Sequence, residues 1–89
     1  MEIVLLTQVD CGFCEQAHRV LHDVAADYPI QVRTVDLGTP DGQVLAERGG
    51  VLFPPGVFID GDAFSYGRLS ERKLRRELDR RLRPRTAAG

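Results

Sequence analysis

Hydrophobic positions follow two different periods along the chain, and the period changes between residues 7 and 11. The first run, Ile3–Leu6, is continuously apolar, which is typical of a central strand buried on both faces. From Cys11 onward the apolar positions recur at helical spacing until Pro29 ends the pattern. We therefore expect a strand over residues 2–7 and then a helix. The expected apolar stripe of this helix consists of Phe13, Ala17, Val20, Leu21, Val24, Ala25 and Tyr28.

Turn and cap signals divide the rest of the chain into further elements. Thr39-Pro40 supplies a hydroxyl N-cap and a first-turn proline for a short helix, which ends at Gly49-Gly50. Asp60-Gly61-Asp62 is typical of a turn between two hairpin strands, and Ser70 is expected to cap the last helix. The predicted elements are strands over residues 30–37, 57–59 and 63–66, a helix over residues 40–49, and a last helix with Leu74, Leu78 and Leu82 as its stripe.

The predicted element order is β-α-β-α-β-β-α, which defines an α/β fold. The first two strands are joined through a helix, so they should be parallel with a right-handed crossover. The last two strands should form an antiparallel hairpin. We predict a four-stranded mixed sheet flanked by helices on both sides. The length of 89 residues suits a single domain, expected over residues 1–83, with residues 84–89 as a flexible tail.

The formal net charge of −1 conceals opposite charges in two parts of the chain. Residues 1–67 carry a charge of about −7, whereas residues 68–89 carry about +6. The basic part suits a docking face for an acidic partner or nucleic acid, or a solvated helix with cations near its C-terminus. Because aromatic residues are not interleaved with these cations, we favour the solvated face and expect no nucleic-acid partner.

The N-terminal apolar run has no basic flank and is too short to cross a bilayer. We therefore expect a cytoplasmic protein with no membrane partner. The chain has two cysteines, Cys11 and Cys14. Cysteines in a reducing compartment seldom form structural disulfides, and catalysis, redox sensing or metal binding is the usual role.

Cys11 and Cys14 are two residues apart and lie at the predicted junction of the first strand and the first helix. Two thiols at this spacing can close a small disulfide ring and reopen it. Unpaired N–H groups at a helix N-terminus favour negative charge, and the thiolate is the nucleophile in disulfide exchange. Asp10 and Glu15 oppose that charge. The motif as a whole is typical of a redox-active dithiol.

The chain resembles a glutaredoxin of the thioredoxin-like superfamily over roughly residues 2–82. Three features carry the resemblance. They are Cys11-Gly12-Phe13-Cys14 after the first strand, Pro55 before the apolar run Val57–Ile59, and the hairpin and terminal helix that follow. The resemblance implies a glutaredoxin-type thioredoxin-like fold. It also implies a thiol–disulfide oxidoreductase that requires no metal or organic cofactor.

The resemblance further implies a role for each residue of the site. Cys11 would be the exposed nucleophile, and Cys14, one helical turn later and deeper, would resolve the mixed disulfide. Pro55 would be in cis and face Cys11, with the backbone of Pro54 offering a hydrogen bond to the substrate. Gly12 and Phe13 would contact the substrate, as would Ser65 and Tyr66.

Two departures from the glutaredoxin pattern bear on the substrate. Ser65-Tyr66 stands where glutathione-using members carry a glycine pair, and Pro54 has no N–H to offer. No lysine precedes Cys11 in the segment 7–10. These differences weaken the expectation of glutathione binding. We expect a monomer that acts on a protein disulfide or on another low-molecular-weight thiol, and that is reset by a reductase or a small thiol.

Metal binding is the alternative to redox chemistry. Cys11, Cys14, His18 and His22 offer four zinc ligands, but four ligands on one straight helix cannot converge tetrahedrally on one ion. The motif is also similar to the Cys-Gly-Phe-Ser of monothiol glutaredoxins that hold a [2Fe–2S] cluster, whose iron needs thiolate ligands. The second hypothesis is therefore an iron–sulfur or metal-binding redox adaptor with the basic helix as its docking surface.

Overall fold

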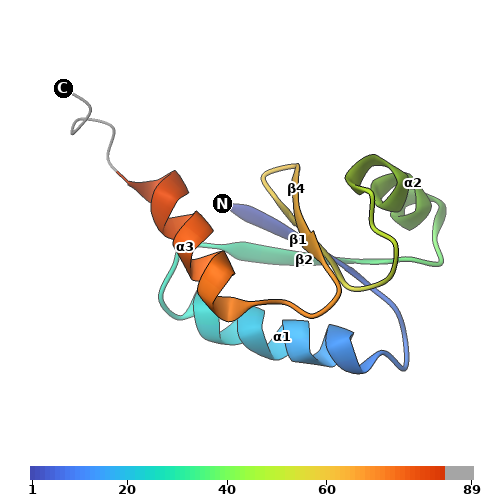
Figure 1. Cartoon of the computed structure of the whole chain (residues 1–89), viewed down its shortest axis with the longest axis horizontal. Helices are drawn as coiled ribbons and strands as arrows, with labels where there is room; N and C mark the ends of the chain where they lie inside the picture. The colour runs from blue at the N-terminus through green and yellow to red at the C-terminus, as the bar shows by residue number, and fades with distance from the viewer. Residues whose placement is uncertain (84–89) are drawn as a thin grey trace.

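The helices and strands follow the predicted order, as Figure 1 shows. The computed structural model describes residues 1–83, and the predicted tail over residues 84–89 lies outside the described residues. The elements are β1 (Glu2–Thr7), α1 (Gly12–Ala25), β2 (Gln31–Asp36), α2 (Pro40–Gly49), β3 (Gly56–Ile59), β4 (Asp62–Tyr66) and α3 (Glu71–Leu82). Within residues 1–83, no helix combines the length and the apolar character that a membrane crossing needs.

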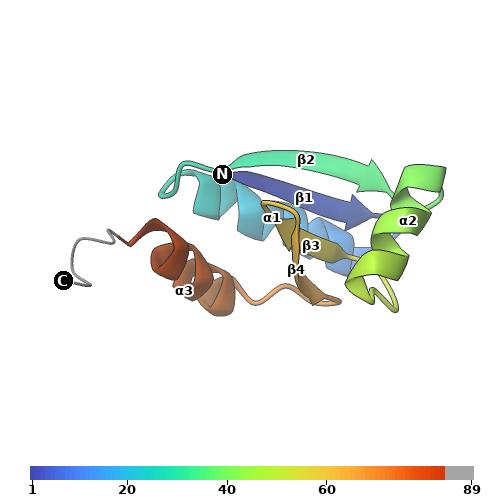
Figure 2. The same ribbon diagram turned by 90° about the horizontal axis from the view of Figure 1, so that it is seen from above.

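The four strands form one sheet in the order β2-β1-β3-β4. β1 pairs in parallel with β2 and antiparallel with β3, and the arrowheads of β1 and β2 point the same way in Figure 2. The interior position of β1 explains why Ile3–Leu6 is buried. β3 and β4 form the predicted hairpin, whose turn residues Asp60 and Gly61 both have positive φ, the combination that a type I′ turn requires.

Each face of the sheet is covered by its own hydrophobic cluster. Ile3 and Leu5 pack in the larger cluster, with the buried residues of α1 and α3. Val4 and Leu6 point to the other face, where Phe58 and the side chains of α2 cover them. Figure 1 shows the sheet between α1 and α2. The predicted α/β architecture with helices on both faces is confirmed.

The predicted cap residues begin and end the helices. The hydroxyls of Thr39 and Ser70 accept hydrogen bonds from backbone N–H groups in the first turns of α2 and α3. Gly50 ends α2 in the left-handed conformation, with a φ of 64°.

The apolar stripe predicted for the last helix needs one correction. Leu74 and Leu78 are fully buried, but Leu82 is 42% exposed. Leu82 belongs to the last turn of α3, beyond the residues that pack in the larger cluster. The buried part of α3 therefore ends one turn earlier than the sequence pattern suggests.

The stripe predicted for the first helix is shifted at both ends. The buried positions are Cys14, Ala17, Val20, Leu21 and Val24. Phe13 is 48% exposed and Ala25 is also exposed. In the first turn of α1, the Cys14 side chain points inward. Phe13 is the residue before it, so its side chain points in a different direction, about 100° around the helix axis. The Phe13 ring is therefore exposed next to the two cysteines in the sequence.

Candidate redox site

Cys11 is the N-cap residue of α1. Its backbone is extended, with φ −118° and ψ 109°, and its Sγ accepts a hydrogen bond from the Cys14 N–H at 3.2 Å. Its carbonyl oxygen accepts hydrogen bonds from the N–H groups of Cys14 and Glu15. The side chain is half-buried. The Cys11 sulfur therefore lies at the positive end of the helix dipole, beside a donor that a negatively charged sulfur can use.

Cys14 lies one turn later and is only 2% exposed. Burial raises the pKa of the Cys14 thiol, and so does a hydrogen bond with Cys11. Hydrogen bonds from the Thr7 side chain and the Gln8 backbone lower this pKa and partly offset the rise. The two thiols are therefore unequal, because one is reachable from solvent and the other is enclosed and held in its protonated form.

The peptide bond between Pro54 and Pro55 is cis, as the resemblance predicted. Pro55 is fully buried and directly precedes Gly56, which pairs with Leu6 on β1. This places Pro55 at the carboxyl end of β1, whose last residue, Thr7, lines the same depression as Cys11 and Cys14. The carbonyl oxygen of Pro55 accepts a hydrogen bond from the Gly67 N–H at 2.8 Å.

An aromatic wall, formed by Phe53 and Tyr66, stands beside the two prolines. The two rings meet edge to face, with centroids 5.2 Å apart. Gly67 lies against the Phe53 ring, and a Cβ at this position would come within 2.9 Å of it. Its φ of 77° also favours glycine. Both aromatic side chains remain partly exposed, at 50% for Phe53 and 39% for Tyr66.

Phe53 is not singled out by the sequence pattern, although an aromatic residue directly before a Pro-Pro pair is a usable signal.

Gly12 and Phe13 are exposed at the start of α1, as their predicted role in substrate contact requires, and that role stays a prediction. Ser65 differs from Tyr66, because its Oγ is buried and has no hydrogen-bond partner within the described part of the chain. The structure therefore places Tyr66 in the aromatic wall, whereas the hydroxyl of Ser65 is buried.

Gln16 is a second residue of the site that the sequence pattern does not single out, and it has no sequence signal at all. Its side chain bonds to the backbone of Leu69, between α1 and the segment that leads into α3. Leu69 is two residues from Gly67, which holds the Pro55 carbonyl. Gln16 therefore ties the helix that carries the cysteines to the segment that supports the cis proline.

The other side of the cysteine pair is acidic. A shallow depression of about 320 Å³ runs from the end of β1 to the second turn of α1. Asp10 and Glu15 lie in its lining with both cysteines and His18, and no Lys or Arg does. A small anionic ligand would meet like charges here, without a cation to bind it.

The spacing of His18 and His22 suggested a metal site as an alternative. Both side chains are exposed on α1, and they line a neighbouring surface depression together. Within residues 1–83, no three His, Cys, Asp or Glu side chains are placed to hold a metal ion.

Comparison with known proteins agrees with this geometry. A solved mutant thioredoxin from Halobacterium salinarum NRC-1 matches with a TM-score of 0.66 and 23% identity, over 89% of this chain and 72% of that one. This likeness shows a thioredoxin-like fold. No curated protein sequence matches the chain. The family model of a glutaredoxin-like domain (DUF836) matches residues 2–79. Since that match spans most of the chain, the protein belongs to the glutaredoxin-like (DUF836) family.

Proposed function

We propose that this protein is a thiol–disulfide oxidoreductase that uses Cys11 and Cys14 as a redox-active dithiol. The observation that carries the proposal is the inequality of the two thiols. Cys11 is reachable at the helix N-cap, whereas Cys14 is enclosed behind it, one turn later. The family and the thioredoxin-like fold support redox chemistry at this position.

In the first step, the Cys11 thiolate attacks one sulfur of a substrate disulfide. A bond forms between Cys11 Sγ and that sulfur, the substrate S–S bond breaks, and the second substrate sulfur leaves as a thiolate that takes up a proton. The N–H of Cys14 donates to the Cys11 sulfur before the attack. The Pro54 carbonyl offers an acceptor for a backbone N–H of the substrate, but Pro54 has no N–H to donate.

In the second step, Cys14 loses its proton and attacks Cys11 Sγ. The Cys11–Cys14 disulfide forms, and the bond to the substrate breaks, so the substrate has gained two electrons and two protons. The raised pKa of Cys14 makes this step depend on proton removal, so its rate should rise with pH. An external dithiol or two small thiols would return two electrons to the protein disulfide.

A redox titration tests the proposal. The protein is equilibrated with thiol–disulfide buffers, free thiols are trapped by alkylation, and the intact mass is read. We expect a single two-electron transition between about −270 and −180 mV. Cys14→Ser should accumulate a stable mixed disulfide with the substrate, because the second step is lost.

Cys11→Ser is the matched control, since it should form neither species. The proposal fails if the two thiols never pair, or if they react with the alkylating agent only after a chelator is added. The second of these results would favour the metal-binding alternative.

A further inference from the structure

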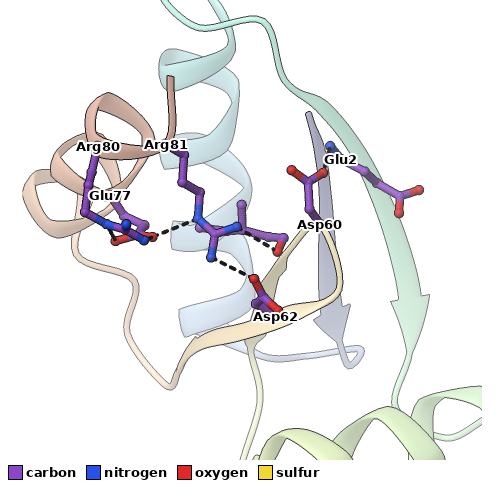
Figure 3. Close-up of polar contacts among 7 residues, drawn as sticks. Glu2, Asp60, Asp62, Glu77, Arg80 and Arg81 are labelled. Atoms are coloured by element: carbon purple, nitrogen blue, oxygen red, sulfur yellow. Dashed lines mark hydrogen bonds and ion pairs between the residues drawn. The ribbon is translucent and has the colours of Figure 1, made fainter. Parts of the chain in front are cut away.

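Seven of the eight cations in residues 68–83 fall into two groups, and the eighth, Arg83, is the C-cap of α3. The first group forms ion pairs. Arg75 pairs with Asp27 and Glu71. Arg80 pairs with Glu77, and Arg81 pairs with both Glu77 and Asp62. Figure 3 shows Arg81 reaching from α3 to Asp62 on the hairpin, with Glu77 between it and Arg80. The charge of these three side chains is thus largely balanced within the protein.

The second group is a basic stripe, formed by Arg68, Arg72, Lys73 and Arg76. All four side chains are exposed, and none makes an ion pair within residues 1–83. Arg72 and Arg76 are one turn apart, on the side of α3 away from the buried Leu74 and Leu78. The carboxylate of Asp79, three residues after Arg76, accepts a hydrogen bond from the Tyr28 hydroxyl and forms no ion pair with the stripe within residues 1–83.

The basic stripe begins at the redox site. Arg68 directly follows Gly67, which packs against the aromatic wall and donates to the carbonyl of the cis proline. Gln16 fixes the next residue, Leu69, to α1. The stripe therefore continues from the wall along α3 and is held in a fixed position relative to Cys11.

The surface around Cys11 is consequently divided by charge. Asp10 and Glu15 line the depression that extends from the cysteines to His18, and no Lys or Arg is in this lining. Arg68 directly precedes Leu69, the residue that Gln16 binds, and Arg72 lies in the first turn of α3. Phe13 and the aromatic wall add exposed apolar side chains to the site.

We infer that the substrate of this site is an acidic segment of a protein, with Asp or Glu residues on the side of its cysteine that faces the basic stripe. The inference rests on the proposed oxidoreductase function. Charge complementarity selects this occupant, because four unpaired cations attract carboxylates while Asp10 and Glu15 repel them on the other side. The stripe extends more than a helical turn beyond the wall, which suits a polypeptide better than a small thiol.

Two peptides test this inference, each with an internal disulfide that closes a ring of the same sequence. One carries Asp and Glu flanks and the other Lys and Arg flanks, and each is mixed with the fully reduced full-length protein in a single-turnover stopped-flow experiment. The reduced protein supplies the two electrons. At low salt we expect the acidic peptide to be reduced at least about tenfold faster, with the difference vanishing at high salt.

Arg72→Glu/Arg76→Glu should abolish this preference. Arg33→Glu/Arg48→Glu is the matched control, because it changes the net charge equally at exposed residues of β2 and α2, which line one depression on the α2 side of the sheet. This control should keep the preference. Circular dichroism of both variants checks that the fold is intact.

The remaining outcomes separate the two proposals. If both peptides are reduced at the same rate at every salt concentration, the docking inference is wrong and the oxidoreductase function stands. If neither peptide is reduced, the proposed function itself fails, and the inference with it. If the acidic peptide has no advantage but a 20-nucleotide DNA binds in physiological salt and Arg72→Glu/Arg76→Glu abolishes that binding, the stripe is a nucleic-acid surface and the inference is overturned.

Discussion

The side-chain amide of Gln16 forms a closed pair of hydrogen bonds with the backbone of Leu69. Its Nε2 donates to the Leu69 carbonyl at 3.0 Å, and its Oε1 accepts from the Leu69 N–H at 3.2 Å. Leu69 is 1% exposed, so neither backbone group could turn to bulk water without a rearrangement. One side chain on the active-site helix thus satisfies both polar groups of a buried residue 53 positions away.

Replacing this amide should lower the stability of the protein. Gln16→Ala leaves the buried N–H and carbonyl of Leu69 without partners, and we expect a loss of about 2 kcal/mol in the free energy of unfolding. Urea denaturation measures this loss. Gln31→Ala is the control, since the exposed Gln31 side chain makes no hydrogen bond within residues 1–83, and it should change stability by less than about 0.5 kcal/mol. Equal losses in the two variants would contradict the role given to Gln16.

The enclosed Cys14 should react slowly with alkylating agents. In Cys11→Ser, Cys14 is the only thiol, and burial, the largest cause of its raised pKa, is retained. We expect iodoacetamide to modify the native variant at least about tenfold more slowly than the same variant in urea, with the rate rising only in alkaline solution. Stopped alkylation read by intact mass measures both rates.

Cys14→Ser provides the comparison, because it leaves the half-buried Cys11 as the only thiol. It should be alkylated faster than Cys11→Ser under native conditions at every pH tested.

The raised pKa of Cys14 also has a consequence for stability. It stabilises the folded protein below the pKa of the unfolded thiol, and this contribution is lost as the pH rises through the folded value.

Glu77 should make the protein sensitive to acid. Hydrogen bonds from Arg80 and then Arg81 lower the pKa of Glu77 to about 2 from an ordinary value of 4.5. A lowered folded-state pKa means that the stabilisation is fully present above about pH 4.5 and is lost as the pH falls towards 2. Because the pair is partly screened by solvent, we expect Glu77→Gln to cost about 1 kcal/mol at pH 7.

Urea titrations of Glu77→Gln and the parent between pH 7 and pH 2 test this expectation. The difference in stability between the two proteins should shrink across the acidic range and vanish near pH 2. Glu47→Gln is the control, as the exposed Glu47 makes no ion pair within the described residues. A constant difference at every pH would show that the charge of Glu77 is not the stabilising factor.

Most of the fold was predictable because its signals are local. The apolar run Ile3–Leu6, the caps Thr39 and Ser70, and the turn at Asp60 each require only a few neighbouring residues. The errors concern burial at element ends. Leu82 has the correct helical spacing, but spacing does not show that the packing surface has ended.

The candidate site was predictable only where a motif carries it. The two cysteines and Pro55 follow from a short pattern and its spacing, and the cis bond at Pro55 is confirmed. The contacts of Gln16 and Phe53 join residues far apart in sequence, with no period or motif to mark them. For the same reason, composition could not show which cations are paired, because Arg81 finds Asp62 only through the folded hairpin.

Two serine-to-alanine substitutions should differ in their effect on the stability of the protein. Ser65 Oγ is buried without a hydrogen-bond partner, so Ser65→Ala removes an unsatisfied polar atom and should leave stability unchanged or slightly raised. Ser70 Oγ accepts from the Lys73 N–H at 3.2 Å as the N-cap of α3, so Ser70→Ala should cost about 1 kcal/mol. Thermal and urea unfolding of both variants measure the difference. A loss of more than about 1 kcal/mol in Ser65→Ala would mean that its hydroxyl has a partner, such as an ordered water, that satisfies it.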